Sequence, residues 1–193
     1  MTHPPSNVWW LVRRGALARS PCAGVEKPVI EASAPGIHTP DQVRQVLTAA
    51  ATDADVRRVL ALQYFAGIRP EEAQRLEESN FLPGYVEVGA QQSKTRRRRL
   101  VKIGPTLRAW LAVGGRLPVT NFRKRWQAVR RLAGVPWSHD VTRHTFASYH
   151  LALTGSADAT AHELGHESAA MLFRHYRAVV TREAAQAFFA LRP

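Results

Sequence analysis

Residues 139–155 read HDVTRHTFASYHLALTG, and this stretch decides the class of fold. Its apolar or small side chains recur at helical intervals and predict one buried helix face: Val141, Thr145, Phe146 and Tyr149. His139 and Arg143 stand four residues apart, so we expect them on another face of a helix that starts near residue 138. An imidazole can move protons near neutral pH, and a guanidinium can bind two phosphate oxygens. A helix cap followed by a surface arginine is the alternative, and the position of the pair off the apolar face weighs against it.

The rest of the chain is also mainly helical. Thr39 and Gln42 form a capping box around Pro40, and a second helix is expected from Asp53 to Ala66, ending at Gly67. Segments 85–88 and 100–103 alternate in polarity and predict strands that flank an arginine-rich stretch. Further helices are expected after Pro70, near Pro105, over 121–133 and over 139–191, with breaks near Gly155 and Gly165. The pattern predicts an α+β protein, mainly α-helical, with one small antiparallel sheet.

The composition of the chain bears on its solubility and on the cellular compartment in which we expect it. The chain has 193 residues, of which 45% are hydrophobic, enough for one substantial core. It lacks an apolar run of the roughly 20 residues that a membrane span needs, and its start does not follow the order of a signal peptide. A single cysteine fits a reducing compartment. We therefore expect a soluble protein of the cytoplasm, with no membrane partner.

The net charge of +12 indicates an anionic partner. Positive side chains gather in two stretches, residues 94–99 and 123–131, without an acidic block to offset them. One such cluster would suit a merely solvated surface, but two favour the phosphate backbone of a nucleic acid. Charge alone does not distinguish an enzyme from a passive DNA binder.

Three further residues carry candidate chemistry, each with a plain alternative. Arg69 stands at a junction between two helices, where it could point into a cleft, but an ion pair with Glu71 or Glu72 explains it equally well. Lys94 lies between the two expected strands, where a hairpin tip could lower it toward a ligand; taken in isolation it is a basic loop residue. Tyr176 lies in a helical stripe, where a tyrosine is more often part of a core than a nucleophile.

Residues 162–166 read HELGH, the H-E-x-x-H spelling of zinc proteases. That site needs a continuous helix, a third ligand and a glutamate base. Gly165 interrupts the helix before the second histidine, and the longer metalloprotease pattern is absent. Glu183 remains a distant third ligand, so a zinc hydrolase using His162, Glu163 and His166 is an open alternative.

Four segments in order resemble the tyrosine recombinase (phage integrase) family. They read YFAGIRPEEAQRL (64–76), SKTRRRRLVKIGP (93–105), HDVTRHTFASYHLALTG (139–155) and ELGHESAAMLFRHY (163–176). The likeness extends from about residue 39 to the C-terminus and covers all six positions of the family's active site. It implies the family's catalytic-domain fold with a three-stranded sheet, and it accounts for the zinc-like spelling, because ELGH is the usual approach to the family's second histidine.

The resemblance implies a role for each of the six positions. Its candidate catalytic residues are Arg69, Lys94, His139, Arg143, His166 and Tyr176. Two arginines and His166 would stabilise the transition-state charge of a phosphodiester, and Tyr176 would attack it. His139 is the candidate for accepting the phenolic proton, and Lys94 the general acid at the departing 5′ oxygen. The product would be a 3′-phosphotyrosyl bond, formed without metal, cofactor or ATP.

The same resemblance implies partners and organisation. Double-stranded DNA would be held by basic side chains outside the catalytic set: Arg96, Arg97, Arg98, Arg99, Arg123, Lys124, Arg125 and Arg130. We expect residues 1–19 to be the last helix of a core-binding domain, 20–38 a linker and 39–193 the catalytic domain, in a prokaryotic or phage-derived protein. In the family, the core-binding domain completes a clamp around DNA. Because only one helix of that domain is expected here, we expect weak DNA affinity and a retained active site.

The segment after Tyr176 reads as an amphipathic C-terminal helix, which would either dock on a neighbouring protomer in a homo-oligomer or pack on its own domain. A DNA-binding module that has lost its catalysis shares every basic feature and is the other alternative function.

Overall fold

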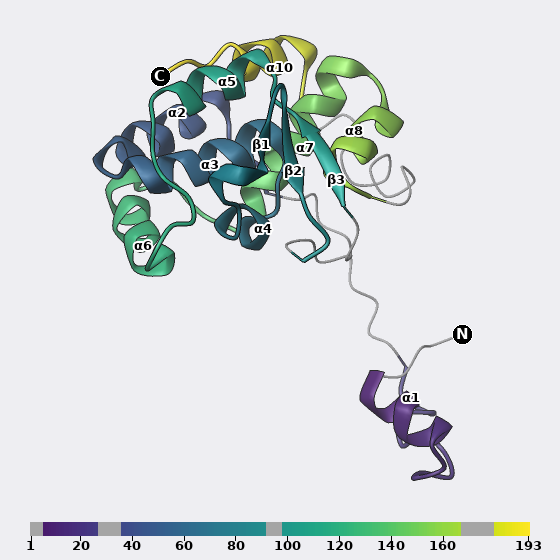
Figure 1. Ribbon diagram of the computed structural model, residues 1–193. Coiled ribbons are helices and arrows are strands. Elements are labelled where there is room, and N and C mark those ends of the chain that lie inside the picture. Colours follow the sequence, from purple (N-terminus) through teal and green to yellow (C-terminus); the bar gives the residue numbers. More distant parts are fainter. Residues whose placement is uncertain (1–5, 27–35, 92–97, 167–179) are drawn as a thin grey trace. The chain divides into compact units, whose positions relative to one another are not determined.

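The computed structural model describes residues 6–26, 36–91, 98–166 and 180–193 (Figure 1). The chain divides into two compact units, residues 1–33 and 34–193. The first unit contains helix α1 (Ser6–Arg13), in which the Arg13 guanidinium stacks 4.6 Å from the centre of the Trp9 ring. No described helix is long and apolar enough to cross a membrane.

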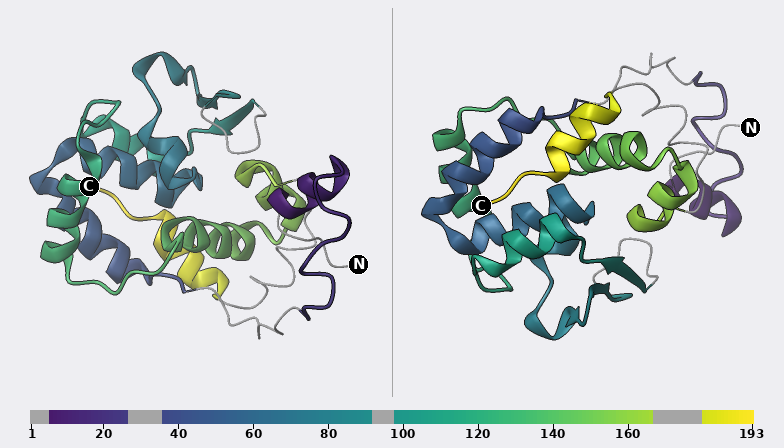
Figure 2. Two further views of the ribbon diagram at one scale, coloured as in Figure 1. Left: turned by 90° about the horizontal axis from the view of Figure 1, so that it is seen from below. Right: turned by 90° about the horizontal axis from the view of Figure 1, so that it is seen from above.

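The second unit is a body of helices with a small sheet at its side (Figure 2). The described α-helices are α2 (Pro40–Ala49), α3 (Ala54–Ala66), α4 (Pro70–Gln74), α5 (Pro105–Ala112), α6 (Phe122–Ala133), α7 (Val141–Thr154), α8 (Ala157–Leu164) and α10 (Arg182–Phe189), and the 3-10 helices are η1 (Ala50–Thr52) and η2 (Glu78–Asn80). The described strands, β1 (Phe81–Leu82), β2 (Tyr85–Val88) and β3 (Arg99–Lys102), form an antiparallel sheet in that order. The predicted fold class is confirmed.

Helices α3 and α7 form the centre of the second unit. Along α3 nearly every residue from Val56 to Ala66 is buried, and α7 is buried over most of its length from Val141 to Leu151. A helix that is apolar or small on all sides belongs inside a protein. The two helices pack against each other, α5 and α4 cover α3, and α10 lies along α7 (Figure 2). The ends of α3 and α7 are therefore held by the core itself.

Local signals set the ends of several helices as predicted. Thr39 caps α2, because its side-chain oxygen accepts a hydrogen bond from the Gln42 backbone amide. The Gln42 side-chain oxygen in turn accepts a hydrogen bond from the Thr39 backbone amide. Asp53 caps α3, which ends at Gly67 in the left-handed conformation, with φ of 61°. Each of these bonds satisfies a backbone group that a helix end leaves open.

Other boundaries differ from the prediction. Helix α4, expected after Pro70, ends already at Gln74, so that the buried Leu76 follows the helix. Strand β3 begins one residue earlier than expected, at Arg99. Helix α7 begins at Val141, because Asp140 has a φ of 53° and cannot continue a right-handed helix.

Gly67 is required both for its backbone conformation and for space. A Cβ atom at this position would lie 2.4 Å from Phe146 Cδ1 and 2.8 Å from Leu164 Cδ2. We expect Gly67→Ala to lower the free energy of unfolding by ~3 kcal/mol, because left-handed strain and overpacking add. Gly155→Ala is the matched control, since Gly155 also ends a helix at φ of 68° but has open space around it. Denaturant unfolding that gave equal losses for both variants would contradict the packing argument.

Candidate functional site

A buried carboxylate joins two arginines at the start of α4. The Glu72 side chain is 1% exposed. The Arg69 backbone amide and Nη1 donate to it at 3.3 and 3.0 Å, and Arg99 donates from Nη1 at 3.2 Å and from Nη2 at 2.5 Å. Burial acts to raise the pKa of Glu72, but the hydrogen bonds and charges of Arg99 and Arg69 outweigh it, and the pKa is lowered. Glu72 is therefore a buried anion that forms ion pairs with two arginines.

Among the described cations of the site Arg143 is the most enclosed, with 5% of the residue exposed. Its Nη1 donates to the Gly67 carbonyl, and its Nη2 donates to the Leu164 carbonyl at 2.6 Å. Both carbonyls belong to helix C-termini that left-handed glycines close, Gly67 after α3 and Gly165 after α8. Such carbonyls lack a partner within the helix and carry the negative end of its dipole. Two helix ends therefore hold the guanidinium in place.

Burial, followed by the positive charges of Arg69 and Arg99, lowers the pKa of Arg143 to about 9. This value lies above neutral pH, so the guanidinium keeps its charge. The described residues use three of its five N–H groups, two on carbonyls and one on His166. No described residue pairs with the other two N–H groups, which provide donors for an anion.

His166 is held as a neutral ring with a defined proton position. Its Nε2 lies 2.9 Å from Arg143 Nη2, and its Nδ1 is buried without a hydrogen-bond partner in the described part of the chain. Because a guanidinium only donates, Nε2 must accept, and the ring proton is assigned to Nδ1. Burial, followed by the charges of Arg143, Arg69 and Arg99, lowers the pKa of His166 to about 4. At neutral pH His166 is thus a neutral donor through Nδ1.

The lowered pKa of His166 makes stability depend on pH. The unfolded chain takes up the proton near the ordinary value of 6.5, whereas the folded chain does so only near 4. Between these values the unfolded state binds more protons, so the free energy of unfolding should fall as the pH is lowered from about 6.5 to about 4. His38 and His150 also have lowered pKa values and act in the same direction. We therefore expect the free energy of unfolding of His166→Asn to depend less steeply on pH between 6.5 and 4 than that of the wild type, with part of the dependence remaining.

The control for this measurement is His162→Asn, because His162 is exposed. Denaturant titrations at several pH values would compare both variants with the wild type. A His166→Asn slope equal to that of the wild type between pH 6.5 and 4 would contradict the assignment of a neutral His166.

His139 differs from its predicted position. It lies in the loop before α7, with a side chain that is 94% exposed and an Nδ1 atom 3.5 Å from Asp140 Oδ2. The expectation that His139 and Arg143 share a helix face away from the apolar stripe is wrong, because α7 starts after His139 and Arg143 points into the interior. The i,i+4 rule applies only when both residues are within the helix.

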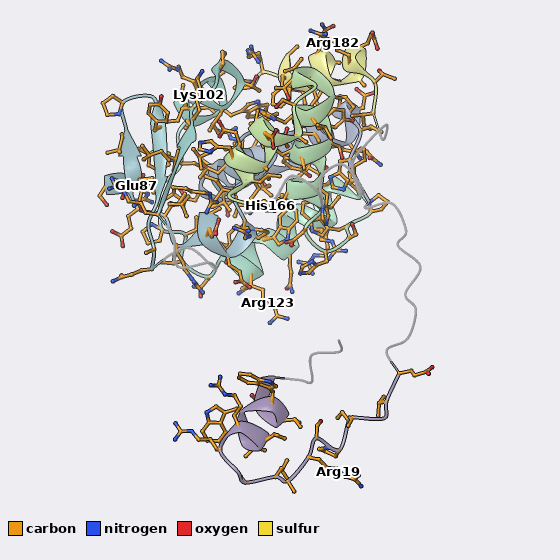
Figure 3. The ribbon with its side chains drawn as sticks, turned by 90° about the vertical axis from the view of Figure 1, so that its right-hand side faces the viewer. Arg19, Glu87, Lys102, Arg123, His166 and Arg182 are labelled. Carbon is orange, nitrogen blue, oxygen red and sulfur yellow. The ribbon has the colours of Figure 1, made fainter. Side chains whose placement is uncertain are left out.

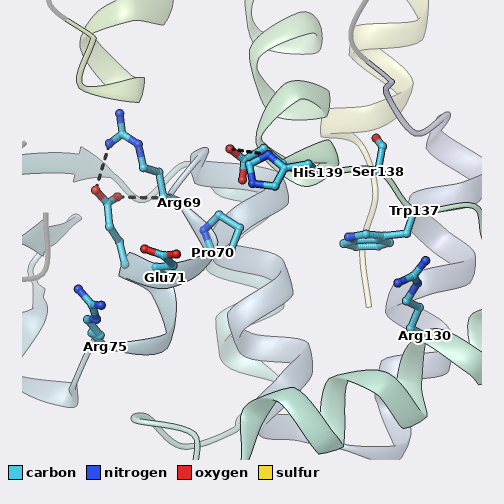
Figure 4. Close-up of a pocket in the computed structure, with 10 residues that line it drawn as sticks. Arg69, Pro70, Glu71, Arg75, Arg130, Trp137, Ser138 and His139 are labelled. Atoms are coloured by element: carbon cyan, nitrogen blue, oxygen red, sulfur yellow. Dashed lines mark hydrogen bonds and ion pairs between the residues drawn. The ribbon is translucent and has the colours of Figure 1, made fainter. Parts of the chain in front are cut away.

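Several of these residues line an open cavity of about 660 Å³ (Figure 4). Arg69 and His139 line it, and it also carries two arginines on its walls, Arg75 after α4 and Arg130 on α6. Arg75 was not among the residues singled out in the sequence. The only local hint was its position in the segment that follows Arg69. The cavity thus presents three guanidinium groups and an imidazole to solvent or ligand, together with the carboxyl groups of Glu71, Glu72 and Asp140.

The structure brings four of the six candidate catalytic residues into one region. Arg143 contacts His166 directly, the charge of Arg69 lowers the pKa of both, and His139 lines the same cavity as Arg69. Lys94 and Tyr176 lie outside the described residues. The sequence analysis named an ion pair of Arg69 with Glu71 or Glu72 as an alternative, and the pair with Glu72 is present. It expected Arg99 to contact DNA and did not join Arg99 to Glu72.

The expected DNA-contacting side chains fall into different groups. Arg123, Lys124 and Arg130 are exposed on α6, and Arg123 projects from the body in Figure 3. Arg98 pairs with Glu87 at 2.6 Å and remains 65% exposed. Arg125 bonds to both Asp53 and Asp55 at the start of α3, and Arg99 is only 12% exposed in its pair with Glu72. Arg96 and Arg97 lie outside the described residues.

The H-E-x-x-H segment does not form the zinc-protease arrangement. Helix α8 ends at Leu164, and Gly165 turns left-handed with φ of 65°, so His162 and His166 do not lie one turn apart on a helix. The Nε2 atom of His166 faces the Arg143 guanidinium. Within the described ranges, no group of three histidine, cysteine or acidic side chains is arranged to hold a metal. The geometry favours phosphate chemistry at arginines over a zinc site.

The chain is similar in sequence to bacterial recombinases. Tyrosine recombinase XerC of Yersinia pestis is 28% identical over 182 residues, which cover 81% of this chain and 60% of that protein. Tyrosine recombinase XerC of Mycobacterium bovis is 31% identical over 123 residues, covering 58% of this chain and 41% of that protein. The chain thus spans 60% or less of the length of these curated relatives. No family model matches it.

Solved structures share the fold. The catalytic domain of bacteriophage HP1 integrase superposes with a TM-score of 0.59 at 22% identity, over 72% of this chain and 86% of that one. The XerA recombinase gives 0.64 at 19% identity, over 82% and 65% of the two chains. A lambda integrase dimer bound to a COC′ core site gives 0.63 at 17% identity, over 89% and 70%. These likenesses show that the second unit has the fold of an integrase catalytic domain.

Proposed function

We propose that this chain, which belongs to the tyrosine recombinase family, cuts and rejoins DNA through a covalent bond between Tyr176 and a 3′ phosphate. The observation that carries the proposal is the Arg143 guanidinium, fixed by two helix ends beside His166 and within the field of Arg69. Rigid cations with N–H groups that no described residue uses suit the charge that a phosphodiester gains at its transition state. A likeness in sequence to tyrosine recombinase XerC and a likeness in fold to an integrase catalytic domain support the same reading.

The proposed reaction needs only groups of this chain. The Tyr176 oxygen attacks the phosphorus, His139 accepts the phenolic proton, and a bond forms between that oxygen and the phosphorus. The bond from phosphorus to the 5′ oxygen breaks, and Lys94 supplies the proton with which the 5′ hydroxyl leaves. Arg69, Arg143 and His166 stabilise the charge on the phosphate oxygens. Attack by a 5′ hydroxyl on the phosphotyrosine reverses the steps and rejoins the strand.

The proposal extends to partners and organisation. Residues 39–193 would be the catalytic domain, 20–38 a linker and 1–19 a helix of a DNA-clamping domain, acting on double-stranded DNA in the cytoplasm. A lambda integrase tetramer has been solved on a Holliday junction, which supports assembly of several copies on DNA. In this chain α10 packs on α7 and buries Phe188 completely. Exchange of the C-terminal helix between protomers would therefore have to uncover Phe188.

The test is a search for a protein–DNA adduct that survives detergent. The full chain is incubated with nicked duplexes of randomised sequence, in buffer that contains a chelator and no ATP. We expect an SDS-resistant adduct whose DNA, once sequenced, reveals the target site, and whose peptide carries the nucleotide on Tyr176 by mass spectrometry. Retarded DNA in a gel shift without any adduct would favour the non-catalytic DNA-binding module. An adduct that required a divalent metal would contradict the proposed chemistry.

A further inference from the structure

We infer that Arg99 is a positioning residue for the proposed strand cleavage: it holds Glu72 and, through Glu72, orients Arg69 toward the scissile phosphate. The inference rests on the proposed function. Arg99 opens β3, whereas Arg69 and Glu72 belong to the start of α4. None of the sequence patterns around Arg99 distinguishes it from the three arginines that precede it.

The geometry of the pair is the first argument. Arg99 places Nη1 3.2 Å from Oε1 and Nη2 2.5 Å from Oε2 of Glu72, so its fork occupies both carboxylate oxygens. Arg69 reaches the same carboxylate through Nη1 alone, 3.0 Å from Oε1. Planar two-point pairing fixes orientation as well as distance. Arg99 therefore fixes the carboxylate, and the carboxylate then determines where the Arg69 guanidinium lies.

Charge is the second argument. The group formed by the Glu72 carboxylate and the two guanidinium groups has a net positive charge. Arg69 therefore keeps part of its attraction for an anion. Without Arg99, the full charge of the buried Glu72 would act on Arg69 alone. The Arg69 guanidinium would then be drawn toward the carboxylate and away from a phosphate in the cavity that it lines.

The third argument is a contact with the loop that carries His166. A Cβ atom on Gly165 would lie 2.8 Å from Arg99 Cδ and 3.1 Å from Arg99 Nε. The Arg99 side chain thus rests against the backbone immediately before His166, and α8 packs on β3 at this point. One side chain touches both the Arg69–Glu72 pair and the approach to His166. Its 12% exposure leaves little of it for direct contact with DNA.

The alternative is that Arg99 only stabilises the fold. Cleavage of two substrates distinguishes the two roles: the selected DNA with its natural scissile phosphodiester, and the same DNA with a methylphosphonate, in which a methyl group replaces one charged oxygen. A positioning role acts on the charge of the phosphate, so its loss should matter far less when that charge is absent. A smaller folded fraction would lower both rates by the same factor.

The variants are Arg99→Gln and Arg99→Lys, measured by the rate of adduct formation in the full chain. We expect Arg99→Gln to lower the rate on the phosphodiester by about 10²-fold and on the methylphosphonate by less than about 10-fold. Arg99→Lys should fall between Arg99→Gln and the wild type, because an ammonium keeps the charge but not the fork. Arg44→Gln breaks a similar arginine–carboxylate pair on the surface, with Asp41, and should leave both rates unchanged.

Equal losses on both substrates, or no loss for Arg99→Gln, would overturn the inference while leaving the proposed function intact. A wild-type chain that forms no adduct on Tyr176 would instead overturn the proposed function, and this inference with it. The two failures are distinguishable because the second is seen before any variant at position 99 is made.

Discussion

Tyr176→Phe is expected to abolish the covalent adduct while leaving DNA binding unchanged. The substitution removes only the phenolic oxygen, which is the atom that bonds to phosphorus, and keeps the ring. Loss of a nucleophile lowers turnover by on the order of 10⁶-fold in well-studied enzymes, so the adduct should fall below detection. The measurement is SDS gel electrophoresis of labelled, nicked DNA of the selected sequence, with a gel shift of the same samples.

Tyr85→Phe is the matched control for that experiment. Tyr85 is an exposed tyrosine at the start of β2, so its hydroxyl can be removed without disturbing the core. We expect wild-type adduct yield from Tyr85→Phe. If Tyr176→Phe still formed adduct, or if both variants lost it equally, Tyr176 would not be the nucleophile.

The sequence predicted the parts of this fold that depend on neighbouring residues. Thr39, Asp53 and Gly67 end or begin helices as expected, because a cap bond or a left-handed glycine acts within a few residues. The class of fold was predictable for the same reason: helical and alternating apolar patterns report local burial. The predicted start of a helix was wrong where a single backbone angle sets it. At Asp140 a φ of 53° delays the start of α7.

The candidate site was predictable only in part, because its contacts join distant parts of the chain. Glu72 and Arg99 are 27 residues apart, and no periodicity links a helix start to a strand start. Arg143 was expected off the apolar face of its helix, and the structure buries it all the same, because α7 runs through the interior and meets the ends of α3 and α8. A residue outside the apolar stripe of a central helix can still be buried when other backbone carbonyls pair with it.

Arg143→Gln is the second prediction of large effect, and it has two readouts. We expect adduct formation to fall by about 10³-fold, since a fixed donor to the transition state is lost. The positive charge of Arg143 is, after burial, the next cause of the lowered pKa of His166, so the His166 pKa should rise toward its ordinary value in the variant. Ring-proton NMR across a pH titration measures that shift without any DNA.

These two readouts separate chemistry from folding. Glutamine can still donate to one helix-end carbonyl but carries no charge, and a folded variant keeps the dispersed NMR signals of the core. A folded Arg143→Gln with lost cleavage and a raised His166 pKa would place the cation beside both the phosphate and the imidazole. Lost cleavage with an unchanged His166 pKa would mean that Arg143 and His166 do not share one site, and the proposed division of labour between them would then be wrong.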